Sequence, residues 1–82
     1  MNQSIQVLDG FTYIDAQQAM RMEAMSAGQL ITCYISDIEK AASSAFYDSN
    51  QFDIEEALVD LIEDQGWNEQ GEVWISALDI NI

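Results

Sequence analysis

Carboxylate side chains are the most abundant group in this sequence that could do chemistry. Fifteen of the 82 residues are Asp or Glu, and six of them crowd into residues 53–64. A metal site built on helices needs such carboxylates to face inward with histidines nearby, and the sequence contains no histidine. We therefore interpret them as a candidate acidic face for partner binding, consisting of Glu55, Glu56, Asp60, Glu63 and Asp64.

The single cysteine, Cys33, is the other group with potential reactivity. It lies in the middle of a predicted strand, where a thiol behaves as a small apolar residue. A catalytic thiolate needs a cationic neighbour or a helix N-terminus to lower its pKa, and neither is evident beside Cys33. Because no histidine is available as a base either, the sequence predicts no catalytic residue, no cofactor site and no enzyme activity.

The charge of the chain restricts its partners. Only Arg21 and Lys40 oppose the fifteen carboxylates, so the net charge is −13. A chain of this charge repels phosphate backbones and anionic lipid surfaces. We therefore expect no direct binding to nucleic acid or to membranes, and we expect a protein with a basic surface as partner. The other interpretation is that the acidity serves solubility or adaptation to a salty cell interior.

We expect a single cytoplasmic domain over residues 1–82. One cysteine fits a reducing compartment. The N-terminal residues lack the basic start and apolar run of a signal peptide. No stretch approaches the roughly 18 apolar residues that a membrane span requires.

Four segments of the chain are typical of strands. Ala19–Ser26 alternates between apolar and polar residues, and Gln29–Ser36 is rich in residues that fit a pleated surface. The short connection between them predicts a hairpin. Residues 4–8, which precede an Asp-Gly turn signal, and residues 72–78 are predicted as the first and last strands. We predict no regular secondary structure for residues 11–18.

Two helices are expected between the third and fourth strands. Ser36 and Glu39 fit a capping box, and the first helix should end near Tyr47, with an apolar face of Ile38, Ala41, Ala42, Ala45 and Phe46. Asp53 and Glu56 fit a second capping box, and Gly66 is the expected end of the second helix. Its apolar stripe has helical spacing and consists of Ile54, Ala57, Leu58, Leu61 and Ile62.

These elements predict a two-layer α+β domain in the order strand, strand, strand, helix, helix, strand. Strands that precede helices favour an antiparallel sheet, here of about four strands with both helices on one face. The residues expected to face the helices are Ile31, Cys33, Ile35, Val73 and Ile75. The candidate residues on the open sheet face are Leu30, Tyr34 and Trp74, with Leu78 beside them. The alternative is that residues 11–18 cover Trp74.

Three stretches of the chain carry a family resemblance: MNQSIQ at residues 1–6, LITCYIS at residues 30–36, and FDIEEALVDLIEDQGWNEQGEVWIS at residues 52–76. With these stretches the sequence resembles the YrdB-like small bacterial proteins, which form family 1488 of the domains of unknown function. The resemblance implies a small α+β protein with about this order of elements, and it implies no activity. The sequence departs from the family at VLDGF, where a proline is usual, and in a less basic middle region.

The function that these features favour is a non-catalytic protein-interaction or regulatory module. It would bind its partner through the acidic helix face, the open sheet face or both, and a homodimer is one form that such binding could take. One alternative is an acidic nucleic-acid mimic or indirect transcriptional regulator. A small metal-binding protein or enzyme is the least favoured alternative.

Overall fold

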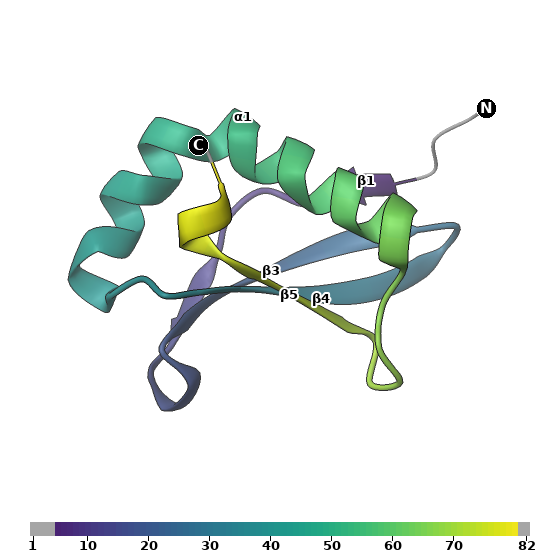
Figure 1. Cartoon of the computed structure of the whole chain (residues 1–82), viewed down its shortest axis with the longest axis horizontal. Helices are drawn as coiled ribbons and strands as arrows, with labels where there is room; N and C mark the ends of the chain where they lie inside the picture. The colour runs from purple at the N-terminus through teal and green to yellow at the C-terminus, as the bar shows by residue number, and fades with distance from the viewer. Residues whose placement is uncertain (1–4, 81–82) are drawn as a thin grey trace.

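The computed structural model describes residues 5–80 of the chain. This part folds into one mixed sheet of five strands, one long helix and two short 3-10 helices. The helix crosses one face of the sheet, so the predicted α+β class is confirmed (Figure 1). In chain order the elements are β1 (Ile5–Val7), β2 (Thr12–Ile14), η1 (Asp15–Gln17), β3 (Ala19–Ser26), β4 (Gln29–Ser36), α1 (Lys40–Gln65), β5 (Glu72–Ser76) and η2 (Ala77–Asp79).

The centre of the sheet is the β3–β4 hairpin, which has the bounds that the sequence predicts. Ser26 pairs with Gln29, and the two residues between them, Ala27 and Gly28, have φ values of 53° and 83°. Positive φ at both central positions is the signature of the type I′ turn, whose twist matches that of the flanking strands. The turn therefore sets the register of the whole hairpin.

Residues 11–18 are more regular than the sequence indicates. Thr12–Ile14 forms β2, which pairs antiparallel with the start of β3, while β1 pairs with the end of β3. The 3-10 helix Asp15–Gln17 follows. The sequence signal is weak because three residues are too few for a periodic pattern, and pairing with β3 supplies the order.

The last strand runs parallel to β4, so the prediction of an antiparallel sheet is wrong for this pair. The reason is the length of the connection between the two strands. A helix such as α1 carries the chain back along the sheet, so that the next strand begins at the same end as the previous one. The strand also stops at Ser76, because residues 77–79 turn into η2.

The two predicted helices are one helix with a kink. Asn50, at φ −126° and ψ 21°, interrupts the helical backbone inside α1, and its side-chain amide donates to the carbonyl oxygen of Phe46 at 3.0 Å. The polar run over residues 48–51 contains neither proline nor glycine, so nothing in it forces the chain to leave the helix. The run bends the helix where the sequence suggests a break.

Neither predicted capping box is formed. Ser36 still belongs to β4, where it pairs with Ser76, and its hydroxyl donates to the carbonyl oxygen of Ile75 at 3.4 Å. The helix begins only at Lys40, with no side-chain hydrogen bond at its N-cap. Asp53 lies three residues after the kink at Asn50, already inside the second half of α1, so it is not at the position of an N-cap. The predicted end at Gly66 is confirmed, since its N–H donates to the carbonyl oxygen of Ile62 at 2.9 Å.

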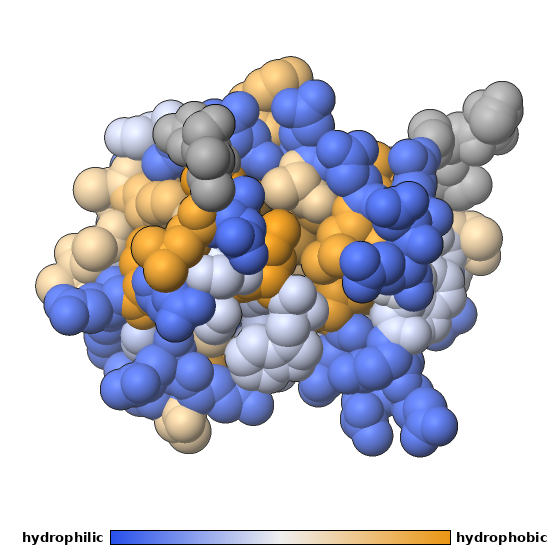
Figure 2. Space-filling model, in the orientation of Figure 1, coloured by the Kyte–Doolittle hydropathy of each residue, from blue (hydrophilic) through white to orange (hydrophobic). Residues whose placement is uncertain are grey.

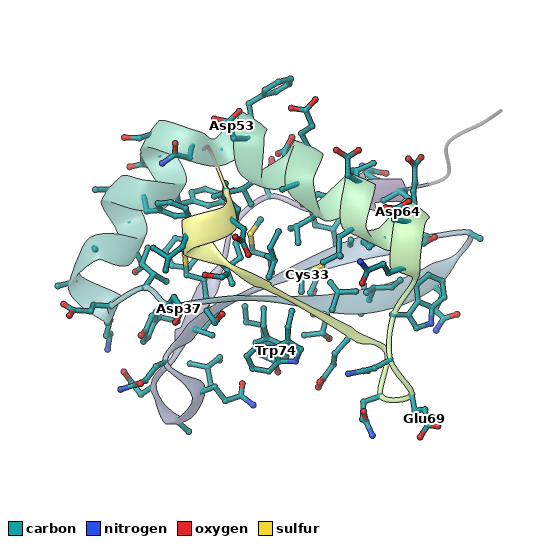
Figure 3. All side chains as sticks on the ribbon, viewed as in Figure 1. Cys33, Asp37, Asp53, Asp64, Glu69 and Trp74 are labelled. Atoms are coloured by element: carbon teal, nitrogen blue, oxygen red, sulfur yellow. The ribbon has the colours of Figure 1, made fainter. Side chains whose placement is uncertain are left out.

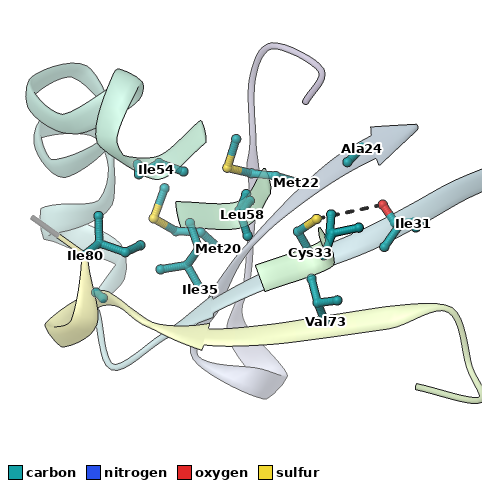
Figure 4. Close-up of a cluster of buried hydrophobic side chains, with 12 residues drawn as sticks. Met20, Met22, Ala24, Ile31, Cys33, Ile35, Ile54, Leu58, Val73 and Ile80 are labelled. Atoms are coloured by element: carbon teal, nitrogen blue, oxygen red, sulfur yellow. Dashed lines mark hydrogen bonds between the residues drawn. The ribbon is translucent and has the colours of Figure 1, made fainter. Parts of the chain in front are cut away.

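The core lies between α1 and one face of the sheet (Figure 4). The predicted stripe of the second half of α1 is confirmed, because Ile54, Leu58 and Ile62 are buried. The stripe predicted for the first half is wrong for Ala41, Ala42 and Ala45, which are exposed, whereas Ile38 and Phe46 are partly buried and pack against the core. Instead, Ser43 is buried and its hydroxyl donates to the carbonyl oxygen of Lys40 at 2.7 Å, which satisfies it without a partner from the sheet.

Candidate protein-interaction surface

Cys33 lies on the face of β4 that meets α1 and is fully buried. Burial and, to a smaller extent, the nearby Glu23 carboxylate raise the pKa of the Cys33 thiol from 9.0 to about 12. Its sulfur lies 4.0 Å from the carbonyl oxygen of Ile31. A buried thiol with a raised pKa is neither a nucleophile nor a thiolate ligand at neutral pH.

The acidic face of α1 lies on the side away from the sheet. Glu56, Asp60, Glu63 and Asp64 are exposed, and Glu55 is half-buried. Figure 3 shows Asp53 and Asp64 on this outer side of the helix. Within residues 5–80, no group of three or more His, Cys, Asp or Glu side chains is arranged to hold a metal ion. The carboxylates of Glu56, Asp60, Glu63 and Asp64 thus carry their charge at the surface of α1.

The other face of the sheet is not covered by the helix. Tyr34 and Trp74 stack on this face, with ring centroids 4.3 Å apart and ring planes 20° from parallel. Figure 3 shows Trp74 on the side of the sheet opposite to Cys33 and α1. Trp74 is 43% exposed and Leu30 is 51% exposed, whereas Tyr34 is only 8% exposed. Trp74 and Leu30 are thus accessible to solvent, and the buried ring of Tyr34 packs against the ring of Trp74.

Residues 11–18 do not cover Trp74. The strand β2 pairs with β3, two strands away from β5. Phe11 turns instead toward α1, where its ring lies 5.1 Å from that of Tyr47. The strand order therefore removes the alternative that this segment protects the aromatic pair.

Charged residues flank the aromatic pair along the sheet. In the strand register, Arg21, Tyr34 and Trp74 form one cross-strand row, and Glu23, Thr32 and Glu72 form the next. Arg21 pairs with Glu23 at 3.4 Å. The indole N–H of Trp74 lies 3.5 Å from a carboxylate oxygen of Glu72, to which it donates. Glu72 was not among the candidate site residues predicted from the sequence. It could have been included, because residues two apart in a strand, such as Glu72 and Trp74, lie on the same face.

A cleft of about 720 Å³ opens where β4 and β5 end, and its lining includes Tyr13, Asp37 and Lys40. The sequence could not indicate it, because a site at the carboxyl ends of two strands requires them to be parallel. Two of its lining residues have charged or polar partners: Asp37 accepts from the Ser76 hydroxyl at 2.7 Å, and Lys40 lies 3.7 Å from Asp15. The charged lining residues of the cleft are three acidic side chains, Asp15, Asp37 and Glu39, and one basic side chain, Lys40.

Apolar side chains also reach the surface along the seam between α1 and β5, with hydrophilic residues around them (Figure 2). The exposed large apolar residues of the described chain are Leu30, Phe52, Trp67, Trp74 and Leu78. Three of these five lie on β5 or on the segments directly before and after it. The edge of the sheet at β5 is therefore the part of the molecule where aromatic surface and solvent meet.

Comparisons with known proteins identify relatives but no activity. A family model described as "Protein of unknown function (DUF1488)" matches residues 6–75. The chain is also similar to the crystal structure of a protein of unknown function from the DUF1488 family from Shewanella loihica PV-4. That match has a TM-score of 0.75 and 28% sequence identity, and it covers 92% of this chain and 94% of the other. No curated protein matches the chain. The helix of the described chain is not long and apolar enough to cross a membrane.

Proposed function

The chain belongs to the DUF1488 family of proteins of unknown function, and we propose that it is a non-catalytic cytoplasmic module that binds a protein with a basic surface. The observation that carries this proposal is the Tyr34–Trp74 stack on the uncovered sheet face. A tryptophan held rigid by a second ring is typical of the residues that dominate binding energy at protein interfaces.

The charge of the molecule supports a basic partner. With a net charge of −13, long-range attraction would speed the approach of a positively charged protein and repel nucleic acid. The acidic face of α1 and the aromatic pair lie on opposite layers of the fold. In this proposal the acidic face of α1 attracts the partner over a distance, and the aromatic pair makes the direct contact.

The absence of catalysis is part of the proposal. Its support is the state of Cys33, whose thiol is buried and protonated at neutral pH, together with the lack of histidine in the sequence.

The test is capture of a partner by tagged protein, with identification by mass spectrometry. Trp74→Ala should reduce recovery of the partner at least about tenfold, since truncating an interface tryptophan costs about 2 kcal/mol or more. Phe52→Ala is the matched control, because Phe52 is 75% exposed on α1, in the other layer of the fold. It should capture as well as the wild type.

Two outcomes would contradict the proposal. Recovery that is unchanged in Trp74→Ala would show that the sheet face is not the contact. Recovery that is lost in a Glu56→Gln, Asp60→Asn double variant, kept in Trp74→Ala and competed by DNA would favour the nucleic-acid mimic instead.

A further inference from the structure

An open hollow of about 310 Å³ lies between the end of α1 and β5. Both tryptophans of the sequence line it, Trp67 from the segment after the helix and Trp74 from the strand. Glu72 contributes a carboxylate, and Leu61 and Val73 contribute apolar wall. The volume is at the lower limit of ligand pockets in proteins, which is about 300 Å³. It suits a single side chain better than a cofactor.

The carboxylate of Glu72 has no counter-ion within the described chain. The two basic residues of the sequence pair elsewhere, Arg21 with Glu23 and Lys40 with Asp15. The contact of Glu72 with the indole N–H of Trp74 at 3.5 Å holds the carboxylate beside the ring without neutralising its charge. The hollow is therefore lined by two tryptophans and by one carboxylate that pairs with no basic residue of the described chain.

The hollow is held in shape before any partner arrives. The side-chain oxygen of Asn68 accepts from the N–H groups of Gln70 and Glu72, both at 2.9 Å. The Asn68 N–H donates to the carbonyl oxygen of Glu72 at 3.0 Å, and Gly71 donates back to Asn68 at 3.0 Å. These bonds fix the segment that carries Trp67 against the strand that carries Trp74, which lowers the entropy cost of binding.

The geometry points to this hollow as a recognition site for an arginine side chain of the partner protein, an inference that rests on the proposed function. Aromatic rings attract cations through their faces, and tryptophan does so most strongly. A guanidinium group can stack on an indole while its N–H groups bond a carboxylate, and an ammonium group lacks the planar shape for both. The net charge of −13 favours the same kind of partner.

The experiment uses the full chain and a minimal probe, Nα-acetyl-arginine methylamide, in a ¹⁵N NMR titration. The sequence has two tryptophans, so the spectrum has two indole N–H signals, which the variant Trp67→Phe assigns. Both signals should shift in a saturable way. The uncharged isostere Nα-acetyl-citrulline methylamide should bind up to about fivefold more weakly, since an exposed charge pair contributes up to about 1 kcal/mol. The lysine analogue should also bind more weakly than arginine.

The carboxylate is tested with two variants that remove the same charge. Glu72→Gln keeps an oxygen that can accept from Trp74 and should weaken arginine binding roughly fivefold. Glu56→Gln, on the exposed side of α1, should leave it unchanged, and the spectrum of each variant reports whether the fold is intact. Equal binding of arginine and citrulline, or equal effects of the two variants, would overturn the inference. Capture of a partner that still depends on Trp74 would then leave the proposed function standing.

Discussion

Cys33 shows how position suppresses the reactivity of a residue. Its thiol is fully buried between the sheet and α1, and its pKa is raised from 9.0 to about 12, chiefly by burial. The sequence predicts this packing role correctly. Ile31, Cys33 and Ile35 are every second residue of a strand, so their side chains share one face. A period of two is enough to assign a residue to a face of a strand once the strand itself is recognised.

We expect the native thiol of Cys33 to react with a disulfide reagent such as DTNB at least about a hundredfold more slowly at pH 8 than in urea-unfolded protein, since both burial and protonation oppose attack. The measurement is the rate of colour release in each state. A native rate equal to the unfolded rate would mean that the strand does not hold Cys33 inside.

The same pKa shift predicts how stability depends on pH. Below pH 9 the thiol is protonated in both states and contributes no pH dependence. Between pH 9 and about 12 the unfolded chain loses the proton that the folded chain retains. The free energy of unfolding should therefore fall as pH rises, by up to about 1.4 kcal/mol per pH unit from this group. Urea unfolding of wild type and Cys33→Ala across this range isolates the contribution, which the variant should lack.

At the scale of elements, the two-residue turn between β3 and β4 could be predicted from the sequence. The course of the long connection between β4 and β5 could not. The turn at Ala27 and Gly28 can be predicted from the sequence, because only two residues separate two segments with strand patterns. The kink at Asn50 cannot be predicted from the sequence in this way. Polar residues at 48–51 resemble a linker, and the structure places only one non-helical residue there, Asn50, between the two halves of α1.

The type I′ turn offers a substitution with a predictable sign. Ala27 has φ 53°, a conformation that costs an alanine about 1–2 kcal/mol and that asparagine adopts more readily. Ala27→Asn should therefore raise the free energy of unfolding by up to about 1 kcal/mol in urea titrations. The same change at Ala45, exposed in α1, should lower it by about 0.5 kcal/mol through helix propensity. A loss of stability at position 27 would contradict the turn geometry.

At the scale of the whole molecule, charge opposes the compact state. Asp60 lies four residues from both Glu56 and Asp64 on the exposed side of α1, and each like-charged pair at this spacing costs about 0.2–0.5 kcal/mol. Asp60→Asn should therefore stabilise the protein by up to about 1 kcal/mol at low salt.

The wild-type melting temperature should rise between 20 mM and 500 mM sodium chloride because salt screens this repulsion. The gain from Asp60→Asn should shrink over the same range, as measured by circular dichroism. A melting temperature that falls with salt in the wild type would show that ion pairs, rather than repulsion, dominate the surface.

The bounds of β3 and β4, the apolar stripe of residues 54–62 and the buried place of Cys33 could be predicted from the sequence, because each depends on local periodicity. The same periodicity placed Trp74 on the face of its strand opposite to Val73, but it left open whether residues 11–18 cover Trp74. The parallel direction of β5 relative to β4 and the uncovered position of Trp74 follow only from the way distant segments pack, which no local pattern encodes. Packing also placed Trp67, Glu72 and Trp74 around one open hollow. That hollow forms because a hydrogen-bonded segment folds back on a strand, and no spacing in the chain encodes a contact of that kind.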